Sequence, residues 1–510
     1  MHSVLCMLDE TAHRLPNKTA VQDPESSLTF GELRAMARSM GTWLASKGGV
    51  DPRDAVALYL EKSPLALAAM LGTVYAGGFY SVIDVRQPQN RVQSICETLH
   101  PALVLTDAAN AEHARELFAN TALCVVDIAD IAAAPVDDDL LCERRTNAVD
   151  TDPLYVNFTS GSTGTPKGVA VCQRSVLDFI PVFTSTFGIC EQDVIANQAP
   201  FDFDVSVKDI YSCLHVGATL VIVPRPYFSN PTQLMDYLCD NGATTLVWAV
   251  SALCFVSIMG GFDYRVPTSV RHVLFSGEVM PPKQLATWQK NLPEARFVNL
   301  YGPTEVTCNC TYFSIERSYG SAEVIPMGTP FANEKVFLLD EHNALVPPSS
   351  AQVTGEVCVA GTCLALGYLG DATRTSAAFV QNPLHDRWPE TVYRTGDLAC
   401  YDEDGNLVFV SRKDHQIKHL GQRIELGDIE AAATAVDGVE QTCCLYDSQR
   451  KRLVLCYVGS IERKDLKERL RITLPQYMVP NNTKKLEAMP LTKNGKIDRG
   501  ELAKLARIRR

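Results

Sequence analysis

Patterns that would mark a membrane protein, a secreted protein or a zinc site are missing from this sequence. No apolar run approaches the roughly 20 residues that a membrane-spanning helix needs. The N-terminal residues lack the basic and apolar regions of a signal peptide, so we expect a cytoplasmic protein. The 17 cysteines form no C-x-x-C pair and no repeated His/Cys spacing, which argues against zinc. In a reducing compartment they are expected to be core residues or free thiols.

The length and the charge distribution predict more than one domain. A chain of 510 residues exceeds what one hydrophobic core supports, and 46% hydrophobic with 21% charged residues is typical of a soluble globular protein. The net charge is −12, but the segment from Ser411 onward holds 21 basic and 13 acidic residues, against 26 basic and 46 acidic residues before it. This asymmetry indicates two domains that attract each other, or a basic surface for an acidic partner. A solvated charged face would give the same count.

The order of strand and helix patterns favours an α/β fold. Short apolar strands alternate with helical patterns and are predicted at 55–60, 103–105, 125–126, 219–223, 245–248 and 272–275. Such alternation is typical of a parallel sheet covered by helices. From about 328 to 409 short strands dominate, and Cys308, Cys310, Cys443 and Cys444 are also read as strand residues. We therefore predict a large body over 1–410, built from parallel βα layers with a smaller β-rich part, and a small α+β domain over 411–510.

A loop rich in glycine and hydroxyl side chains follows the predicted strand 154–158. It contains Thr159, Ser160, Gly161, Ser162, Thr163 and Gly164, and then Lys167. Small side chains let backbone N–H groups close around a phosphate, while the hydroxyls and the lysine add donors and charge. The spacing differs from the G-x-x-x-x-G-K-[ST] P-loop. A flexible polar linker is the plainer alternative.

This loop resembles the phosphate loop of the adenylate-forming superfamily, which contains nonribosomal peptide adenylation domains, acyl-CoA synthetases and luciferases. Other segments resemble that superfamily's motifs in the same order along nearly the whole chain. They are residues 28–33, 75–84, 299–305, 355–369, 393–398, 412–416, 423–427, 474–480 and 494–499. On these motifs the chain is identified as a member of the superfamily.

The resemblance implies that a carboxylate attacks the α-phosphate of ATP and that pyrophosphate leaves. Positive charge is needed where negative charge develops, so the 159–168 loop with Lys167 is expected to hold the β- and γ-phosphates. Lys496 would bridge the carboxylate and the α-phosphate. Glu305, beside Thr304, is a hard oxygen ligand suited to Mg²⁺.

Further roles around the nucleotide follow from the same resemblance. Asp397 would accept hydrogen bonds from both ribose hydroxyls, with Arg412 close by. Tyr301 would stack on adenine while Asn299 reads its edge. Taken singly, Asp397 could be a turn aspartate, Glu305 a surface residue and Lys496 the residue after a tight turn.

The C-terminal domain of the superfamily adopts two orientations, one for adenylation and one for thioester formation, so we expect a mobile lid. Asp414 matches the hinge position, where one residue absorbs the backbone rotation. Two departures from the usual motifs, at Ser411 and at 419–421, remove no catalytic group.

Asp204 matches the aspartate that binds the substrate's α-ammonium in amino-acid-activating members. The matching pocket positions are Phe203, Val205, Lys208, Ala249, Leu274, Ser276, Gly277, Leu300, Cys308 and Asn309. They predict a small to medium, unusually polar pocket. Lys208 stands four residues after Asp204 on a predicted helix, where it can pair with Asp204 or bind a second, side-chain carboxylate. An acidic amino acid and a small polar one such as serine, cysteine or D-alanine both remain open.

No carrier segment follows Lys496, which stands 14 residues before the last residue. We therefore expect a free-standing enzyme that loads an amino acid onto the phosphopantetheine of a separate carrier protein, with ATP and Mg²⁺ and without nucleic-acid or membrane partners. D-alanine:carrier protein ligases are the alternative, and Asp204 argues against an acyl-CoA synthetase. A catalytically silent scaffold would not need Lys167, Glu305, Asp397 and Lys496.

Overall fold

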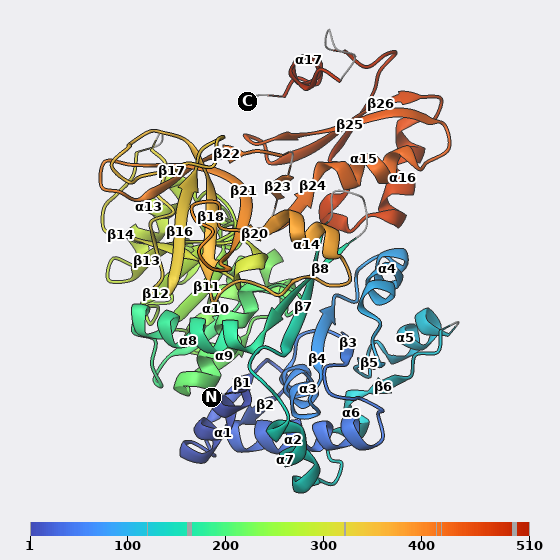
Figure 1. Ribbon diagram of the computed structural model, residues 1–510, viewed down its shortest axis with the longest axis vertical. Coiled ribbons are helices and arrows are strands. Elements are labelled where there is room, and N and C mark those ends of the chain that lie inside the picture. The colour runs from blue at the N-terminus through green and yellow to red at the C-terminus, as the bar shows by residue number, and fades with distance from the viewer. Residues whose placement is uncertain are drawn as a thin grey trace. The chain divides into compact units, whose positions relative to one another are not determined.

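The computed structural model describes residues 2–119, 121–160, 166–320, 323–414, 416–419, 421–491 and 497–508 (Figure 1). Contacts within the chain divide it into two compact units. The first unit comprises Met1–Val85, Leu99–Asn157 and Val169–Lys413. The second comprises Arg86–Thr98, Phe158–Gly168 and Asp414–Arg510. The predicted domain boundary between 410 and 411 stays a prediction.

A seven-stranded sheet carries the βα alternation of the N-terminal sequence. Its order is β19-β8-β7-β4-β3-β5-β6, and β3 pairs in parallel with β4 and β5. Its strands are β3 (Ala55–Tyr59), β4 (Phe79–Ile83), β5 (Leu103–Thr106), β6 (Val125–Asp127), β7 (Pro153–Thr159), β8 (Lys167–Cys172) and β19 (Gly367–Tyr368). All residues of β3, β4 and β5 are buried, which explains why these strands are continuous apolar runs in the sequence.

A nine-stranded sheet has the order β15-β14-β13-β12-β11-β9-β10-β1-β2. Its strands are β1 (Thr19–Gln22), β2 (Ser27–Thr29), β9 (Val194–Asn197), β10 (Thr219–Ile222), β11 (Thr245–Ala249), β12 (His272–Ser276), β13 (Arg296–Tyr301), β14 (Thr311–Ile315) and β15 (Thr329–Pro330). In the middle of the sheet, each strand of the run β13-β12-β11-β9-β10-β1 pairs in parallel with its neighbours. The predicted α/β fold with parallel layers is thereby confirmed.

Helices cover these two sheets. The first group consists of α1 (Leu5–Arg14), α2 (Phe30–Ser46), α3 (Pro64–Tyr75), α5 (Ala111–Phe118), α6 (Ile128–Ile131) and α7 (Asp138–Thr146). Thr29 and Glu32 form a capping box that begins α2. α2 and α3 approach closely, since a Cβ at Gly41 would lie 2.5 Å from that of Tyr75. Figure 1 shows α1, α2, α3 and α7 gathered together.

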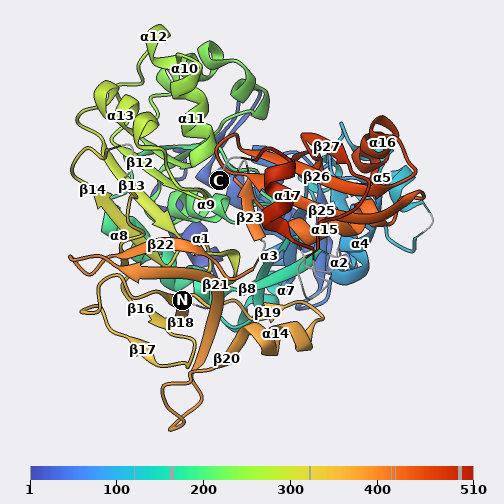
Figure 2. The ribbon, with the colours of Figure 1, turned by 90° about the horizontal axis from the view of Figure 1, so that it is seen from above.

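The second group of helices lies around the nine-stranded sheet. It consists of α8 (Gln173–Phe187), α9 (Val205–Val216), α10 (Pro231–Asp240), α11 (Val250–Ile258), α12 (Gly261–Tyr264) and α13 (Pro282–Asn291), with the 3₁₀ helices η1 (Arg225–Ser229) and η2 (Thr304–Val306). Figure 2 shows α10, α11, α12 and α13 packed together beside β12 and β13. Gly217 follows the last residue of α9, and its φ of 86° is the left-handed conformation that favours glycine at a helix end.

The β-rich part predicted from about 328 to 409 forms a third, antiparallel sheet in the first unit. Its order is β17-β16-β18-β21-β20, with β22 on β21. The strands are β16 (Glu334–Leu339), β17 (Leu345–Val346), β18 (Gly355–Gly361), β20 (Phe379–Gln381), β21 (Thr391–Tyr401) and β22 (Leu407–Arg412), and α14 (Ala372–Ala378) precedes β20. Cys308 and Cys310 precede β14 and lie in no strand, so that prediction was wrong. Cys308 has a φ of 78°, which the extended backbone of a strand excludes.

The second unit has its own core. It contains the pair β23 (Gln416–His419) and β24 (Gln422–Glu425), and a sheet of β25 (Val439–Asp447), β26 (Arg452–Gly459) and β27 (Asn482–Lys485). Its helices are α4 (Gln89–Leu99), α15 (Leu426–Thr434), α16 (Arg463–Thr473), η3 (Gln476–Met478) and α17 (Arg499–Leu505). Leu455, Tyr457, Leu466 and Leu470 are fully buried in its core.

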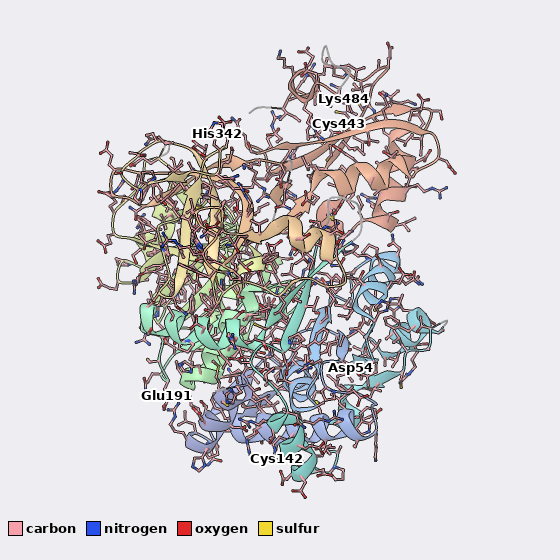
Figure 3. The ribbon with its side chains drawn as sticks, in the orientation of Figure 1. Asp54, Cys142, Glu191, His342, Cys443 and Lys484 are labelled. Carbon is pink, nitrogen blue, oxygen red and sulfur yellow. The ribbon has the colours of Figure 1, made fainter. Side chains whose placement is uncertain are left out.

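All 17 cysteines are free thiols, as the sequence predicts. Figure 3 labels one buried example, Cys443 on β25, and one exposed example, Cys142 on α7. Across the residues that the structure covers, no helix is both long enough and apolar enough to cross a bilayer.

Candidate active site

Several predicted site residues stand at the carboxyl ends of neighbouring parallel strands. Ala249 ends β11, Ser276 ends β12 and Tyr301 ends β13. The register pairs Ala249 with Ser276 directly. In open α/β sheets, ligands bind outside this edge. The fold therefore brings these residues, which are far apart in the sequence, to one edge of the nine-stranded sheet.

Two residues predicted to lie at the nucleotide, Tyr301 and Arg412, both contact a third, Asp397. The Tyr301 hydroxyl donates to Asp397 Oδ2 over 2.5 Å, and Arg412 donates to Asp397 Oδ1 over 2.6 Å. Asp397 is buried, with 4% of its surface exposed. Burial and the Asp397 carboxylate raise the pKa of Tyr301 well above its usual value, so the phenol keeps its proton and donates it. Each carboxylate oxygen has a second lone pair, which leaves capacity for ribose hydroxyls.

The remaining nucleotide candidates lie on or just after β13. Asn299 donates through Nδ2 to the carbonyl of Pro326 over 2.8 Å. Thr304 and Glu305 begin η2, and Glu305 is fully buried. The Tyr368 hydroxyl donates to Glu305 Oε1 over 2.8 Å. A buried carboxylate that a tyrosine hydroxyl orients is a pre-positioned oxygen ligand.

The chemistry of this position fits Mg²⁺. Within the described ranges, no group of three or more His, Cys, Asp or Glu side chains is placed to hold a metal. Mg²⁺ in phosphate-binding enzymes is commonly held by one or two carboxylates together with substrate phosphates and water. Glu305 can supply such a carboxylate.

Part of the predicted phosphate loop falls within the described residues of the second unit. The Thr159 hydroxyl is buried without a hydrogen-bond partner. Such a group is rare in folded proteins and is consistent with a donor to a bound phosphate. Ser160 donates to the carbonyl of Arg423 over 2.7 Å and accepts from the N–H of Glu425. Lys167 is the first residue of β8 and is 8% exposed. The other loop candidates, Gly161, Ser162, Thr163 and Gly164, and the predicted catalytic Lys496 lie outside the described residues.

The substrate candidates near α9 form a buried polar group. Asp204 immediately precedes α9 and is 5% exposed. The Lys208 ammonium donates to Asn309 Oδ1, and both residues are buried. The Cys308 thiol donates to the backbone carbonyl of Asp204 over 3.0 Å. Thr307 and Cys308 both have positive φ, a strained conformation that is often found at functional sites.

The other predicted pocket residues are mostly apolar. Five of them are buried, with at most 7% exposure: Val205, Ala249, Leu274, Ser276 and Leu300. Phe203 and Gly277 are partly exposed, and Gly277 has a φ of 99°. Of the two alternatives for Lys208, the ion pair with Asp204 is not found, because the Lys208 ammonium is directed to Asn309 instead.

The hinge candidate follows a strongly anchored residue. Within the first unit, Glu356 Oε2 accepts from Lys413 over 2.9 Å and from Arg394. Burial acts to raise the pKa of Glu356, but the hydrogen bonds from Lys413 and Arg394 outweigh it and hold that pKa below its usual value. In the second unit, Asp414 Oδ1 accepts from the N–H of Gln416 over 3.1 Å. The hinge role of Asp414 stays a prediction.

Sequence reasoning missed Lys62, which organises the loop before Asp204. Its ammonium donates to Asn197 Oδ1 and to the carbonyls of Asn197 and Gln198, over 3.0 to 3.1 Å. Gln198 Oε1 accepts from the N–H of Ala249. Asn197 Nδ2 donates to Asp209 Oδ2 over 2.7 Å, and burial raises the pKa of Asp209 to about 7. No local motif marks Lys62, because its partners lie 135 residues or more along the chain.

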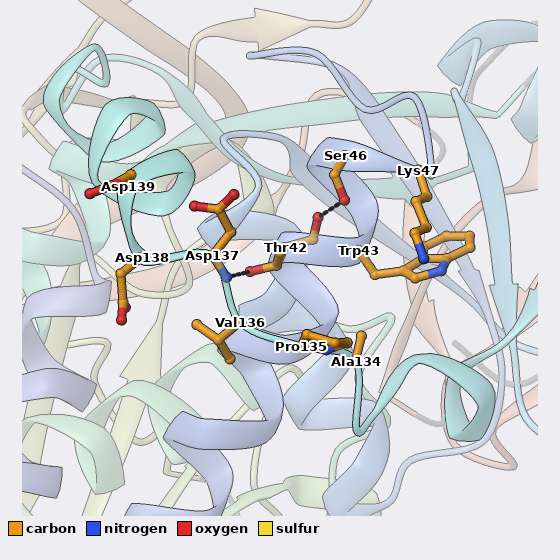
Figure 4. A pocket seen from close by; sticks show the side chains of 10 residues that line it. All are labelled: Thr42, Trp43, Ser46, Lys47, Ala134, Pro135, Val136, Asp137, Asp138 and Asp139. Atoms are coloured by element: carbon orange, nitrogen blue, oxygen red, sulfur yellow. Dashed lines mark hydrogen bonds between the residues drawn. The ribbon is translucent and has the colours of Figure 1, made fainter.

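A separate pocket of about 520 Å³ lies between α2 and the segment that leads into α7 (Figure 4). The Thr42 hydroxyl accepts from the N–H of Asp137, and Asp137 in turn caps α7. Asp138 and Asp139 occupy the first turn of α7, where negative charge is favourable at a helix N-terminus. None of the predicted site residues lines this pocket, and helix capping accounts for its acidic side chains.

A family model and known relatives match most of this chain. Residues 8–369 match the family model described as AMP-binding enzyme. Tyrocidine synthase 3 of Brevibacillus parabrevis is 33% identical over 97% of this chain, which spans only 7% of that relative's length. Zwittermicin A synthase ZmaJ of Bacillus cereus is 31% identical over 98% of this chain and 94% of its own length.

A solved structure has the same fold. It is holo-PA1221, described as an NRPS protein containing adenylation and PCP domains bound to a vinylsulfonamide inhibitor. Its TM-score with this chain is 0.83 at 26% identity, over 99% of this chain and 84% of that one.

Proposed function

Since the chain belongs to the AMP-binding enzyme family, as its motifs predicted, we propose that it is an amino-acid:carrier protein ligase. It activates an amino acid with ATP to aminoacyl-AMP and pyrophosphate, and then transfers the aminoacyl group to the phosphopantetheine thiol of a carrier protein. The observation that carries the amino-acid assignment is the buried carboxylate of Asp204 before α9. Asp204 stands at the position where amino-acid-activating members bind the α-ammonium of the substrate, and carboxylate oxygens there can accept hydrogen bonds from that ammonium.

In the first step a carboxylate oxygen of the amino acid attacks the α-phosphorus of ATP. The bond to the bridging oxygen breaks, and pyrophosphate leaves with its electron pair. Asp397 holds the ribose, and Tyr301 and Arg412 fix the carboxylate of Asp397 for that task. Lys167 binds phosphate oxygens, and Lys496 stabilises the charge that develops around the α-phosphate. Positioning and positive charge together lower the barrier.

Glu305 is the residue that would hold Mg²⁺. When bound, Mg²⁺ neutralises charge on the phosphates of the nucleotide. Tyr368 orients the Glu305 carboxylate for this role.

In the second step the carrier's thiolate sulfur attacks the carbonyl carbon of the aminoacyl-AMP. The bond to the phosphate oxygen breaks and AMP leaves, while the thiol proton passes to solvent. The PA1221 protein, whose structure contains adenylation and PCP domains, supports a carrier as the acceptor. The basic balance from Ser411 onward supports an acidic carrier surface as the partner, and the reduced thiols and the use of ATP support a cytoplasmic location.

The test is amino-acid-dependent exchange of labelled pyrophosphate into ATP, followed by acylation of a separately supplied holo-carrier or of free CoA. We expect exchange with at least one amino acid, and faster transfer to the carrier, at a rate that falls as salt rises. A D-alanine:carrier protein ligase is the special case in which D-alanine alone supports exchange. Efficient CoA thioester formation without carrier preference would identify an acyl-CoA synthetase instead.

A further inference from the structure

Lys208 on α9 is a buried cation with little compensation. Its side chain is fully buried, and its ammonium donates to one neutral acceptor, Asn309 Oδ1. Within the part of the chain that the structure describes, this ammonium forms no ion pair with a carboxylate. Burial lowers the pKa of Lys208, although Cys308, Asp204 and Asp209 act in the opposite direction. An ammonium has three N–H donors, so the cluster leaves charge and donor capacity unused.

A buried donor without a hydrogen-bond partner lies on β7. Tyr155 lies on β7 with no exposed surface, and its hydroxyl has no hydrogen-bond partner. Its ring stacks on Tyr80 at 6.0 Å between centroids. The Tyr80 hydroxyl is hydrogen-bonded to that of Tyr211 over 3.0 Å. It therefore provides no hydrogen bond to the Tyr155 hydroxyl. Tyr211 lies three residues after Lys208 on α9, so the tyrosine group that contains Tyr155 contacts the helix that carries Lys208.

Orphaned buried donors are rare in folded proteins, because each loses its hydrogen bonds to water without replacement. One such donor, the Tyr155 hydroxyl, together with a buried ammonium whose hydrogen bond goes to a neutral acceptor, indicates a missing acceptor. A carboxylate supplies several lone pairs and a full negative charge. It would therefore satisfy the Tyr155 hydroxyl and neutralise the Lys208 ammonium at once.

We propose that Lys208 and Tyr155 bind a side-chain carboxylate of the substrate, which makes an acidic amino acid, aspartate or glutamate, the substrate class of this enzyme. The inference rests on the proposed function, because it assigns the substrate of the same site. Asp204 takes the α-ammonium and Lys208 takes the distal carboxylate, so the two charges of opposite sign on the protein orient the substrate. Asn309 holds the Lys208 ammonium in place through Oδ1. The rival arrangement is a Lys208–Asn309 pair that only fills space and leaves room for a small neutral side chain.

The first measurement needs no variant. Pyrophosphate exchange is compared across the L- and D-forms of aspartate, glutamate, asparagine, glutamine, alanine, serine and cysteine, and across the other amino acids. We expect kcat/KM for an acidic amino acid to exceed that of its amide by about ten- to a hundredfold, the effect of losing a charged hydrogen-bond pair. Exchange that is best with alanine, serine or another neutral amino acid overturns the inference and leaves the proposed function standing. No exchange with any amino acid removes the proposed function itself.

Two variants then test the donors, Lys208→Met and Tyr155→Phe, which keep side-chain volume while removing the charge or the hydroxyl. Each should lower kcat/KM for the acidic substrate by about tenfold or more and change the value for the matching amide far less. Tyr401→Phe is the matched control, because it removes a buried hydroxyl from β21 of another sheet. Thermal unfolding of each variant separates loss of binding from loss of folding. If a folded variant lost kcat/KM equally for the acidic amino acid and for its amide, the assignment would be contradicted.

Discussion

The Lys62 ammonium lies 3.0 Å from Asn197 Oδ1, although the two residues are 135 positions apart in the sequence. Lys62 follows β3 of the seven-stranded sheet and Asn197 ends β9 of the nine-stranded sheet, so the contact joins these two sheets of the first unit. The same ammonium also binds the carbonyls of Asn197 and Gln198. The chain leads from this point to Asp204, so we infer that Lys62 positions the residue proposed to bind the α-ammonium of the substrate.

Replacing Lys62 by methionine should therefore weaken amino-acid binding more than nucleotide binding. Lost hydrogen bonds from a charged donor cost about 1.5–3 kcal/mol, so we expect KM for the amino acid to rise about tenfold or more while KM for ATP changes little. Lys62→Arg should restore part of the effect. Lys47→Met, at an exposed lysine, is the control. A parallel rise of both KM values would refute the positioning role.

Tyr301 tests the nucleotide group. Tyr301→Phe removes the 2.5 Å hydrogen bond to Asp397 but leaves that of Arg412. The Asp397 carboxylate should then be less well oriented for ribose, and KM for ATP should rise about fivefold to tenfold, the effect of roughly 1 kcal/mol. Tyr312→Phe, on the adjacent strand β14, is the control. KM for ATP is measured by steady-state pyrophosphate exchange, with ATP varied at saturating amino acid. An unchanged KM for ATP would contradict the proposal that Tyr301 orients Asp397 for ribose binding.

Asp209 gives a pH-dependent prediction for stability. Burial raises its pKa from 3.8 to about 7 in the folded protein. A carboxyl whose folded pKa lies above its unfolded value stabilises the fold below pH 4, and this contribution is lost as pH rises to 7. Asp209→Asn should therefore gain stability relative to the natural protein between pH 4 and pH 7, by about 4 kcal/mol at most.

Denaturant unfolding of both proteins at several pH values between 4 and 8 measures this difference. Asp428→Asn, another buried carboxyl at the start of α15 in the second unit, reports how much of the change is specific to Asp209. A difference between natural protein and Asp209→Asn that stays constant across this range would show that Asp209 does not titrate there.

Lys496 gives a prediction that comes from the sequence alone. Lys496→Ala should lower the rate of aminoacyl-AMP formation by about 10²–10³-fold, the usual effect of removing a charge from the transition state. Transfer from a chemically supplied aminoacyl-AMP to the holo-carrier should remain largely intact, because Lys496 is assigned to adenylation only. Single-turnover assays of the two half-reactions separate these effects, with Lys504→Ala, at an exposed lysine on α17, as the control. Adenylation at near the natural rate would remove Lys496 from the mechanism.

The sequence by itself determined the fold class and the family. Buried parallel strands are apolar on both faces, so runs such as β3 can be recognised without any knowledge of their partners. The superfamily motifs are likewise contiguous, since each supplies a turn or a strand end from neighbouring residues. This is why Tyr301, Asp397 and Arg412 could be nominated from three separate motifs and then found in contact.

The tertiary structure alone decided which side chains pair. Sequence spacing on α9 allowed Lys208 to pair with Asp204, but the fold directs it to Asn309, 101 residues away. Lys62 and Tyr155 carry no local signal, because the partners of Lys62 and the missing partner of Tyr155 become evident only when distant strands meet. Hydrogen bonds act over about 3 Å, whereas a sequence pattern reports only on neighbours along the chain. The residue types of the candidate site could therefore be predicted from the sequence. Which of these side chains contact one another was decided by the packing of the sheets.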